Sequence, residues 1–208
     1  AIFYRIHAQS RVLEEALRGA AVPYQIIGGM KFFERAEIKD MLSYLRLIEN
    51  PQSDTDLLRV INVPTRGVGQ KTVSKLLDVA SENTISLSGA LERALADGVF
   101  TGATDKKLQS FWDLLLDLRA AREKMSPADL LERILEQTGY KALLEKDDTA
   151  ESDARLENLA ELVGSLREYE EEAPETGETP TLLGYLERVA LVAVADTMED
   201  GPKVSLMT

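Results

Sequence analysis

A glycine-rich turn between two helical patterns is the segment whose residue types and spacing best suit chemistry. Residues 57–77 read LLRVINVPTRGVGQKTVSKLL, so an apolar helical pattern runs into Gly67-Val68-Gly69 and a second helical pattern begins near residue 70. Glycines let the main chain approach another molecule closely, and free amides at a helix N-terminus attract a phosphate group. The segment therefore predicts a helix-hairpin-helix that contacts a nucleic-acid backbone.

Side chains around this turn would strengthen such a contact. Arg66 and Lys71 supply positive charge, and Thr72 supplies a hydroxyl group. Contacts with phosphates carry no information about base sequence, so binding should be independent of sequence and sensitive to salt. The residues leave one alternative open, in which the glycines merely join two packed helices and the charges have no ligand.

The same turn has a superficial likeness to the phosphate loop of nucleotide-binding proteins, G-x-x-x-x-G-K-[ST]. Gln70 stands where that pattern requires glycine, and Thr65 stands where its first glycine should be. The segment before the turn is helical, whereas a phosphate loop follows a strand. We therefore do not expect this segment to hydrolyse a nucleotide.

No other group of residues predicts a catalytic or metal site. His7 is the only histidine and follows a strand-like run, where it could face a ligand. The absence of cysteine excludes disulfides, thiolate metal sites and a cysteine nucleophile, and Trp112 is expected in a helix core. The paired carboxylates lack an orienting partner and are expected to be solvated: Glu14-Glu15, Asp147-Asp148 and Glu170-Glu171-Glu172.

The overall composition sets limits on function. The chain has 208 residues, of which 44% are hydrophobic and 29% charged, an ordinary globular balance. Its net charge of -12 disfavours a free-standing nucleic-acid binder, but only basic charges occur between Asp56 and Asp78, so one surface can be basic. No apolar run approaches the roughly 20 residues that span a bilayer, and no signal sequence is evident. We expect a soluble, cytoplasmic protein without a membrane partner.

The hydrophobic periodicity predicts a few strands at the ends of the sequence and helices between them. Strand-like runs at 1–6 and 23–27 enclose a helical pattern at 9–19, which predicts a parallel β-α-β unit, and 204–207 is strand-like again. The expected fold class is mainly α, with a helical insertion between pieces of an α/β domain. The whole sequence reads as an excised segment. A polar loop is expected at 174–180. Helices are expected at 36–49, 57–63, 72–81, 86–96, 106–124, 127–138, 153–172 and 181–194.

Three stretches together resemble the UvrD/PcrA/Rep family of superfamily 1 DNA helicases. They are AIFYRIHAQSRVLEEAL at 1–17, IIGGMKFFERAEIKDMLSYLRL at 26–47 and VINVPTRGVG at 60–69, with weaker echoes at 155–159, 182–191 and 204–208. Proteins of this family have two RecA-like domains with ATP between them, and a helical accessory domain, 2B, interrupts the second, 2A. The resemblance implies that 1–28 is part of 2A, that 29–201 is 2B with the hairpin at 57–77, and that 202–208 returns to 2A.

The resemblance also implies a function and a set of site residues. The parent protein would be a 3'-to-5' DNA helicase that uses ATP and Mg²⁺, while this segment, without the ATPase motifs, would bind no cofactor and be inactive alone. Its partners would be duplex DNA and single-strand/duplex junctions, in repair or replication. Residues implied to contact duplex DNA are Thr65, Arg66, Gly67, Val68, Gly69, Lys71 and Thr72.

Two further groups of residues are implied by the family's F-Y-R-x-N-A-Q-S-R segment and by the junction that follows it. Arg5 and His7 would lie on the single-strand path, although His7 stands where the family has asparagine. Arg11 would brace the fold. Gly28 and Gly29 would form a hinge between 2A and 2B.

A second function class remains open beside the DNA-binding one. The acidic helices around 145–172 could dock a repair or transcription protein, or another helicase copy, and so act as a regulatory module. An independent enzyme is disfavoured, because no nucleophile, base and orienting group can be assembled from this sequence.

Overall fold

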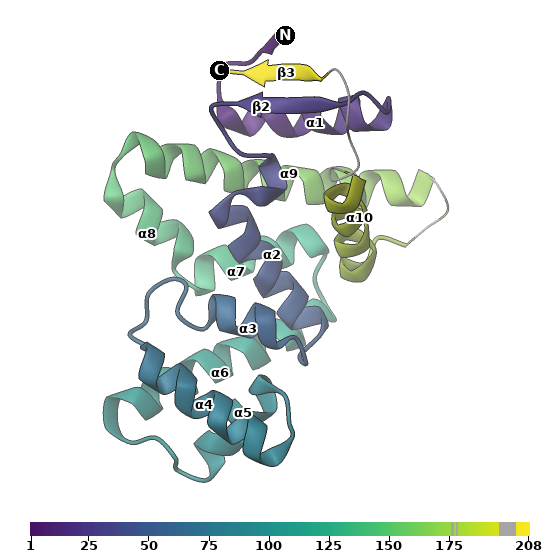
Figure 1. The fold of residues 1–208 in the computed structure, drawn as a ribbon. Coiled ribbons are helices and arrows are strands. Elements are labelled where there is room, and N and C mark those ends of the chain that lie inside the picture. Colours follow the sequence, from purple (N-terminus) through teal and green to yellow (C-terminus); the bar gives the residue numbers. More distant parts are fainter. Residues whose placement is uncertain (176, 178, 196–202) are drawn as a thin grey trace. The chain divides into compact units, whose positions relative to one another are not determined.

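The computed structural model describes residues 1–175, 177, 179–195 and 203–208 (Figure 1). The chain divides into two compact units, one formed by 1–39 with 144–208 and the other by 40–143. The boundaries implied at 28/29 and 201/202 stay a prediction. Helices predominate among the described residues, so the fold is mainly α, as predicted.

The first unit contains a parallel sheet of three strands. They are β1 (Ile2–Phe3), β2 (Tyr24–Ile27) and β3 (Val204–Met207), in the order β1-β3-β2. β3 pairs with both neighbours, so that Leu206 lies opposite Ile2 on one side and Ile26 on the other. The predicted parallel β-α-β unit is present, but its two strands are joined only through β3.

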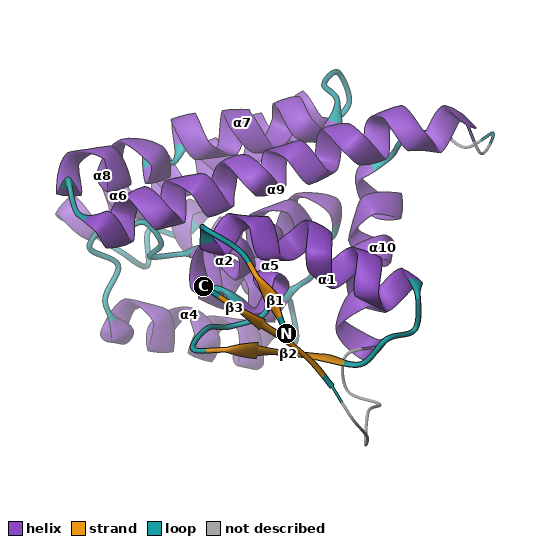
Figure 2. Cartoon of the chain, turned by 90° about the horizontal axis from the view of Figure 1, so that it is seen from above, coloured by secondary structure: helices purple, strands orange, loops and turns teal. Residues whose placement is uncertain are grey.

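Helix α1 (Ser10–Gly19) follows the short 3₁₀ helix η1 (His7–Gln9) and runs beside the strands, as Figures 1 and 2 both show. The core beneath it contains Tyr4, Tyr24 and Leu206, with Leu13 and Leu17 of α1 packed against them. Side chains alternate across a strand, so Phe3 and Ile27 point away from this core and are exposed.

Three helices complete the first unit: α8 (Tyr140–Asp147), which begins in the second unit, α9 (Ala150–Glu175) and α10 (Leu182–Ala195). The apolar face of α9 is buried from Leu159 to Tyr169. The loop predicted at 174–180 was wrong at its start, because α9 continues through Pro174 to Glu175. Residues 176 and 178 of that loop lie outside the described residues.

The second unit consists of helices. α2 (Ala36–Glu49) leads into α3 (Asp54–Val60), α4 (Gln70–Asn83), α5 (Leu87–Ala96), α6 (Gly102–Arg122) and α7 (Pro127–Gln137). Serine hydroxyls cap two of them, since Ser86 accepts a hydrogen bond from the amide of Gly89 and Ser126 accepts one from Asp129. The largest fully buried side chains include Tyr44, Phe111, Met41, Leu57 and Leu76.

Two sequence-based predictions about helices need correction. Helix α8 was missed, because it has only 8 residues and follows the stop signal at Gly139. Helix α3 was predicted at 57–63 but begins at Asp54, since its first turn is made of acidic residues, Asp54 and Asp56, which suit a helix N-terminus.

Candidate nucleic-acid interface

The candidate hairpin joins α3 to α4 through residues 61–69. Gly69 precedes the first helical residue in an extended conformation (φ -87°, ψ 171°), and no side chain caps the helix. The amides of Thr72 and Val73 donate to the Gly69 carbonyl oxygen at 3.0 and 3.2 Å. The first turn of α4 contains no acidic residue. Its N-terminus is thus suited to attract an anion.

The side chain of Asn62 fixes the path of the turn. Its Oδ1 atom accepts hydrogen bonds from the backbone amides of Arg66 at 3.0 Å and Val68 at 3.1 Å. Gly67, between them, has φ of +74°, which favours glycine. Val68 is buried and its amide is already bonded to Asn62, so the predicted contact of Val68 with a ligand has no free donor there. Sequence reasoning missed Asn62, although an asparagine before a proline-glycine turn commonly bonds nearby amides.

Arg66 is held inside the turn rather than extended into solvent. Its Nη1 donates to the carbonyl oxygens of Val60 at 2.7 Å and Ile61 at 3.0 Å, and its Nη2 donates to the Tyr44 hydroxyl at 2.9 Å. The guanidinium also lies 4.8 Å from the centre of the Phe111 ring of α6. Arg66 therefore satisfies carbonyl groups left open at the end of α3, a bracing role that the sequence did not predict.

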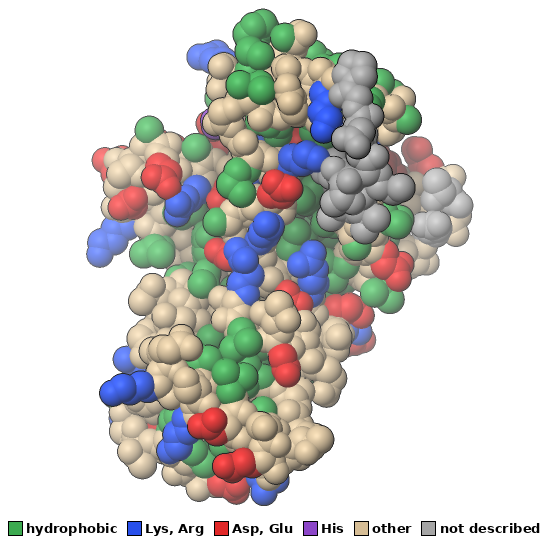
Figure 3. Space-filling model, viewed as in Figure 1, with side chains coloured by type: hydrophobic (Ala, Val, Ile, Leu, Met, Phe, Trp, Pro, Cys, Tyr) green, Lys and Arg blue, Asp and Glu red, His purple; other side chains and the backbone are tan. Residues whose placement is uncertain are grey.

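The remaining predicted hairpin residues differ in exposure. Thr65 and Lys71 are exposed and Thr72 is half-buried. Among the described residues, no hydrogen bond or ion pair engages the Lys71 side chain. Figure 3 shows basic and acidic side chains interspersed on the face drawn there. A local contact with phosphates is compatible with this surface, whereas a large basic binding field is not.

Lys107 of α6 joins this group, although no sequence pattern linked it to the turn. A Cβ atom placed on Gly67 would lie 2.5 Å from the Lys107 Nζ atom and 3.3 Å from its Cε atom. The lysine side chain therefore lies across the glycine. Only the packing of α6 against the turn brings these two residues together.

The predicted single-strand and hinge residues lie in the first unit. Arg5 is exposed, and its backbone amide donates to the Gln9 side chain at 3.0 Å. His7 is half-buried beside the junction, because a Cβ atom on Gly29 would lie 3.5 Å from the His7 Cε1 atom. Gly28 has φ of +78°. The structure thus brings His7 to the glycine pair and leaves Arg5 in solvent.

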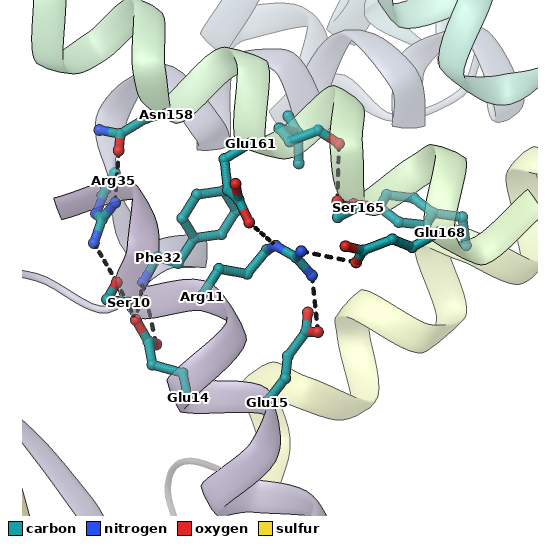
Figure 4. Close-up of polar contacts among 12 residues, drawn as sticks. Ser10, Arg11, Glu14, Glu15, Phe32, Arg35, Asn158, Glu161, Ser165 and Glu168 are labelled. Atoms are coloured by element: carbon teal, nitrogen blue, oxygen red, sulfur yellow. Dashed lines mark hydrogen bonds and ion pairs between the residues drawn. The ribbon is translucent and has the colours of Figure 1, made fainter. Parts of the chain in front are cut away.

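A buried arginine ties α1 to α9 (Figure 4). Arg11 is 2% exposed and forms ion pairs with Glu161 at 2.6 Å, Glu168 at 2.7 Å and Glu15 at 2.8 Å. Burial alone would lower the pKa of Arg11, but Glu161 and the other carboxylates hold it above its ordinary value. The bracing role predicted for Arg11 is confirmed by these contacts.

Glu14 corrects the prediction that the paired carboxylates are solvated. It is 2% exposed, and its carboxylate accepts hydrogen bonds from the Ser10 hydroxyl at 2.7 Å and the Phe32 amide at 3.1 Å. Burial raises its pKa, while these hydrogen bonds oppose the shift. Arg35 donates to the same Ser10 at 2.6 Å and to Asn158 at 2.7 Å (Figure 4). These contacts fix the segment after the glycine pair.

Four of the other paired carboxylates are solvated as predicted, whereas Glu15 is half-buried in an ion pair with Arg11 and Glu170 is half-buried. Asp147, Asp148, Glu171 and Glu172 are exposed. Hydrogen bonds from Ser152 and from a neighbouring threonine lower the pKa of Asp147. Within the described parts of the chain, no group of three or more histidine or acidic residues could hold a metal ion. No described helix is long and apolar enough to cross a membrane.

Comparison with known proteins gives consistent matches over the whole sequence. The family model for the UvrD-like helicase C-terminal domain matches residues 1–208. The chain is 41% identical over 208 residues to the ATP-dependent DNA helicase PcrA of Staphylococcus aureus (strain Mu50 / ATCC 700699), and 40% identical over 211 residues to that of Staphylococcus epidermidis (strain ATCC 12228 / FDA PCI 1200). Each match covers 100% of this chain and 28% of the relative, so the chain spans about a quarter of the relatives' length. These matches confirm the resemblance of the three segments, and the chain belongs to the family of UvrD-like helicase C-terminal domains.

Proposed function

We propose that this chain is the accessory part of a 3'-to-5' ATP-dependent DNA helicase and that it grips the backbone of duplex DNA at residues 65–72. The observation that carries the proposal is the uncapped N-terminus of α4, which is free of acidic residues in its first turn and follows the glycine turn. The names of the relatives, ATP-dependent DNA helicases, support the helicase part.

The residues of the hairpin divide into ligands and supports. The main-chain amides of Gly67 and Gly69 and those of Gln70 and Lys71 at the start of α4 would face a phosphate, with the Lys71 ammonium and the Thr65 and Thr72 hydroxyls beside it. Arg66 and Asn62 would hold this main chain in place from within the turn. Because every proposed contact is with the backbone of DNA, binding would not distinguish base sequences.

ATP hydrolysis is proposed only for the whole protein. In a phosphate loop a strand precedes the glycines, but here helix α3 precedes them. The residues GVGQKT therefore do not fit a nucleotide, and no step with ATP or Mg²⁺ is assigned to this chain. We further propose that residues 1–28 and 202–208 belong to 2A and residues 29–201 to 2B, with Gly28-Gly29 as the hinge and with Arg5 and His7 on the single-strand path.

The alternative role as a protein-docking module has less support. It was based on the acidic helices around 145–172, whose carboxylates would have to face a partner. Two of these, Glu161 and Glu168, form ion pairs with the buried Arg11 and are therefore used within the unit. Capture of repair or transcription proteins would have to rely on other residues.

Fluorescence anisotropy with labelled duplex, single-strand and 3'-tailed DNA tests the proposal, with the 208-residue chain titrated over a salt series. Lys71→Ala should lower the salt slope of log K by about 0.9, the value for one phosphate contact. Lys124→Ala is the matched control, because it removes the same charge from an exposed site beyond the C-terminal end of α6. Equal slopes for Lys71→Ala, Lys124→Ala and the unaltered chain would contradict the hairpin as the DNA site.

A further inference from the structure

The contact between Lys107 and Gly67 places a second cation beside the turn. Three atoms of the Lys107 side chain, Cδ, Cε and Nζ, lie within 3.7 Å of the position that a Gly67 Cβ would occupy. Since glycine has no side chain there, the end of the lysine side chain can lie against the turn. Its ammonium is thereby brought from α6, which is 40 residues distant in the chain, to the hairpin between α3 and α4.

The Lys107 ammonium has no counter-charge within the described parts of the chain, and the same holds for its neighbour Lys106. Lys75 of α4 provides a comparison within the same unit. Its Nζ donates to the Val99 carbonyl oxygen at 2.7 Å and lies 5.1 Å from the centre of the Phe100 ring. Lys75 is therefore anchored by the fold, whereas the Lys107 ammonium lies beside Gly67 without a hydrogen bond or ion pair to a described residue.

Both unpaired lysines line an open groove of about 630 Å³ on the second unit. Its lining includes the basic residues Arg66, Lys106 and Lys107 and, farther along α6 than the two lysines, Asp113 and Asp117. From Lys107 to Asp113 the helix rises by about 9 Å. A phosphate would be attracted beside Gly67 and repelled beyond it, so the groove suits one phosphodiester group rather than a continuous track of DNA.

We infer that Lys107, with Lys106 beside it, binds a DNA phosphodiester group next to the one held at the N-terminus of α4. The inference rests on the proposed function, since the same duplex would occupy both places. Gly67 then has two roles, because its conformation shapes the turn and its missing side chain leaves room for Lys107. The backbone contact would span two helices, α4 and α6, instead of one hairpin.

The test is the salt dependence of duplex binding by the 208-residue chain. Lys107→Ala should lower the salt slope by about 0.9, which corresponds to about eightfold weaker binding at 0.1 M salt. Lys107→Arg should retain the slope, because it keeps the charge. Lys71→Ala is measured in parallel, Lys124→Ala serves as the charge control, and circular dichroism verifies that each variant is folded.

Each pattern of results separates this inference from the proposed function. Lower slopes for both Lys71→Ala and Lys107→Ala would support both. If only Lys71→Ala lowers the slope, the Lys107 contact is overturned and the hairpin grip remains. If only Lys107→Ala lowers it, the contact on α6 stands and the grip on α4 is wrong. Unchanged slopes for both variants would overturn the inference and the proposed function. The absence of duplex binding at about 20 mM salt, the low end of the salt series, would also overturn them.

Discussion

Replacement of Arg66 by alanine should destabilise the second unit more than it changes the number of phosphates bound. The substitution removes the donors that reach Val60, Ile61, Val63 and Tyr44 at 2.7–3.2 Å. A hydrogen bond from a charged group contributes roughly 1.5–3 kcal/mol when buried, but Arg66 is half-buried and some carbonyls would regain water. Counting two bonds at about 1 kcal/mol each, with ~0.5 kcal/mol from the Phe111 ring, the expected loss is about 2–3 kcal/mol.

Urea unfolding would measure this loss. It would be followed by circular dichroism at about 222 nm, the usual band for a mainly helical chain. Arg66→Lys should recover little of it, because an ammonium cannot reproduce the forked geometry of a guanidinium. In DNA titrations, Arg66→Ala should weaken binding through disorder of the turn yet leave the salt slope unchanged, in contrast to Lys71→Ala. A loss below about 0.5 kcal/mol together with a reduced salt slope would refute this reasoning and restore Arg66 as a phosphate ligand.

Four other outcomes are expected. In urea titrations, Arg11→Ala should lower the free energy of unfolding by about 3 kcal/mol, because three carboxylates lose their buried partner. A loss under about 1 kcal/mol would contradict the bracing role. Gly67→Ala should cost about 1–2 kcal/mol in the same assay, since φ is +74° there, and an increase in stability would argue against this conformation. Asn62→Ala should lower the free energy of duplex binding at least as much as the free energy of unfolding, because two amides of the turn lose their acceptor. Unaltered anisotropy would show that Asn62 does not support the DNA site. Glu14 has a folded-state pKa above its ordinary value of 4.5, so its protonation stabilises the fold as pH falls through that raised pKa toward 4.5. The stability of the unaltered chain relative to Glu14→Gln should therefore increase over that interval, and a difference that is constant from about pH 7.5 down to the ordinary pKa of 4.5 would contradict the buried carboxylate.

Periodicity was sufficient to predict most of the secondary structure. The buried face of α9 and the strand at 204–207 follow directly from apolar spacing, which burial imposes on any helix or strand. The parallel β-α-β unit was also correct. The position of β3 between β1 and β2 could not be predicted, because spacing along the chain carries no information about which strands pair.

The candidate site was predictable as a segment but not as a set of roles. A basic side chain beside a glycine turn can bind either a phosphate or a free carbonyl, and the sequence pattern is the same in both cases. Arg66 binds carbonyls because α3 ends beside it. Lys107 and the burial of Glu14 depend on contacts with other helices, which no local pattern reveals.

The central position of β3 has a consequence for the order of folding. Neither β1 nor β2 has a ladder partner among the described strands until β3 arrives, and residues 28–203 separate β2 from β3. Closing a loop of that length costs an entropy on the order of 5 kcal/mol. During synthesis the helices of residues 40–143 emerge before β3, and their contacts are nearer in sequence, so they can fold while β1 and β2 still lack β3. The sheet would therefore form last, and β3 would join the two outer strands in a single late event.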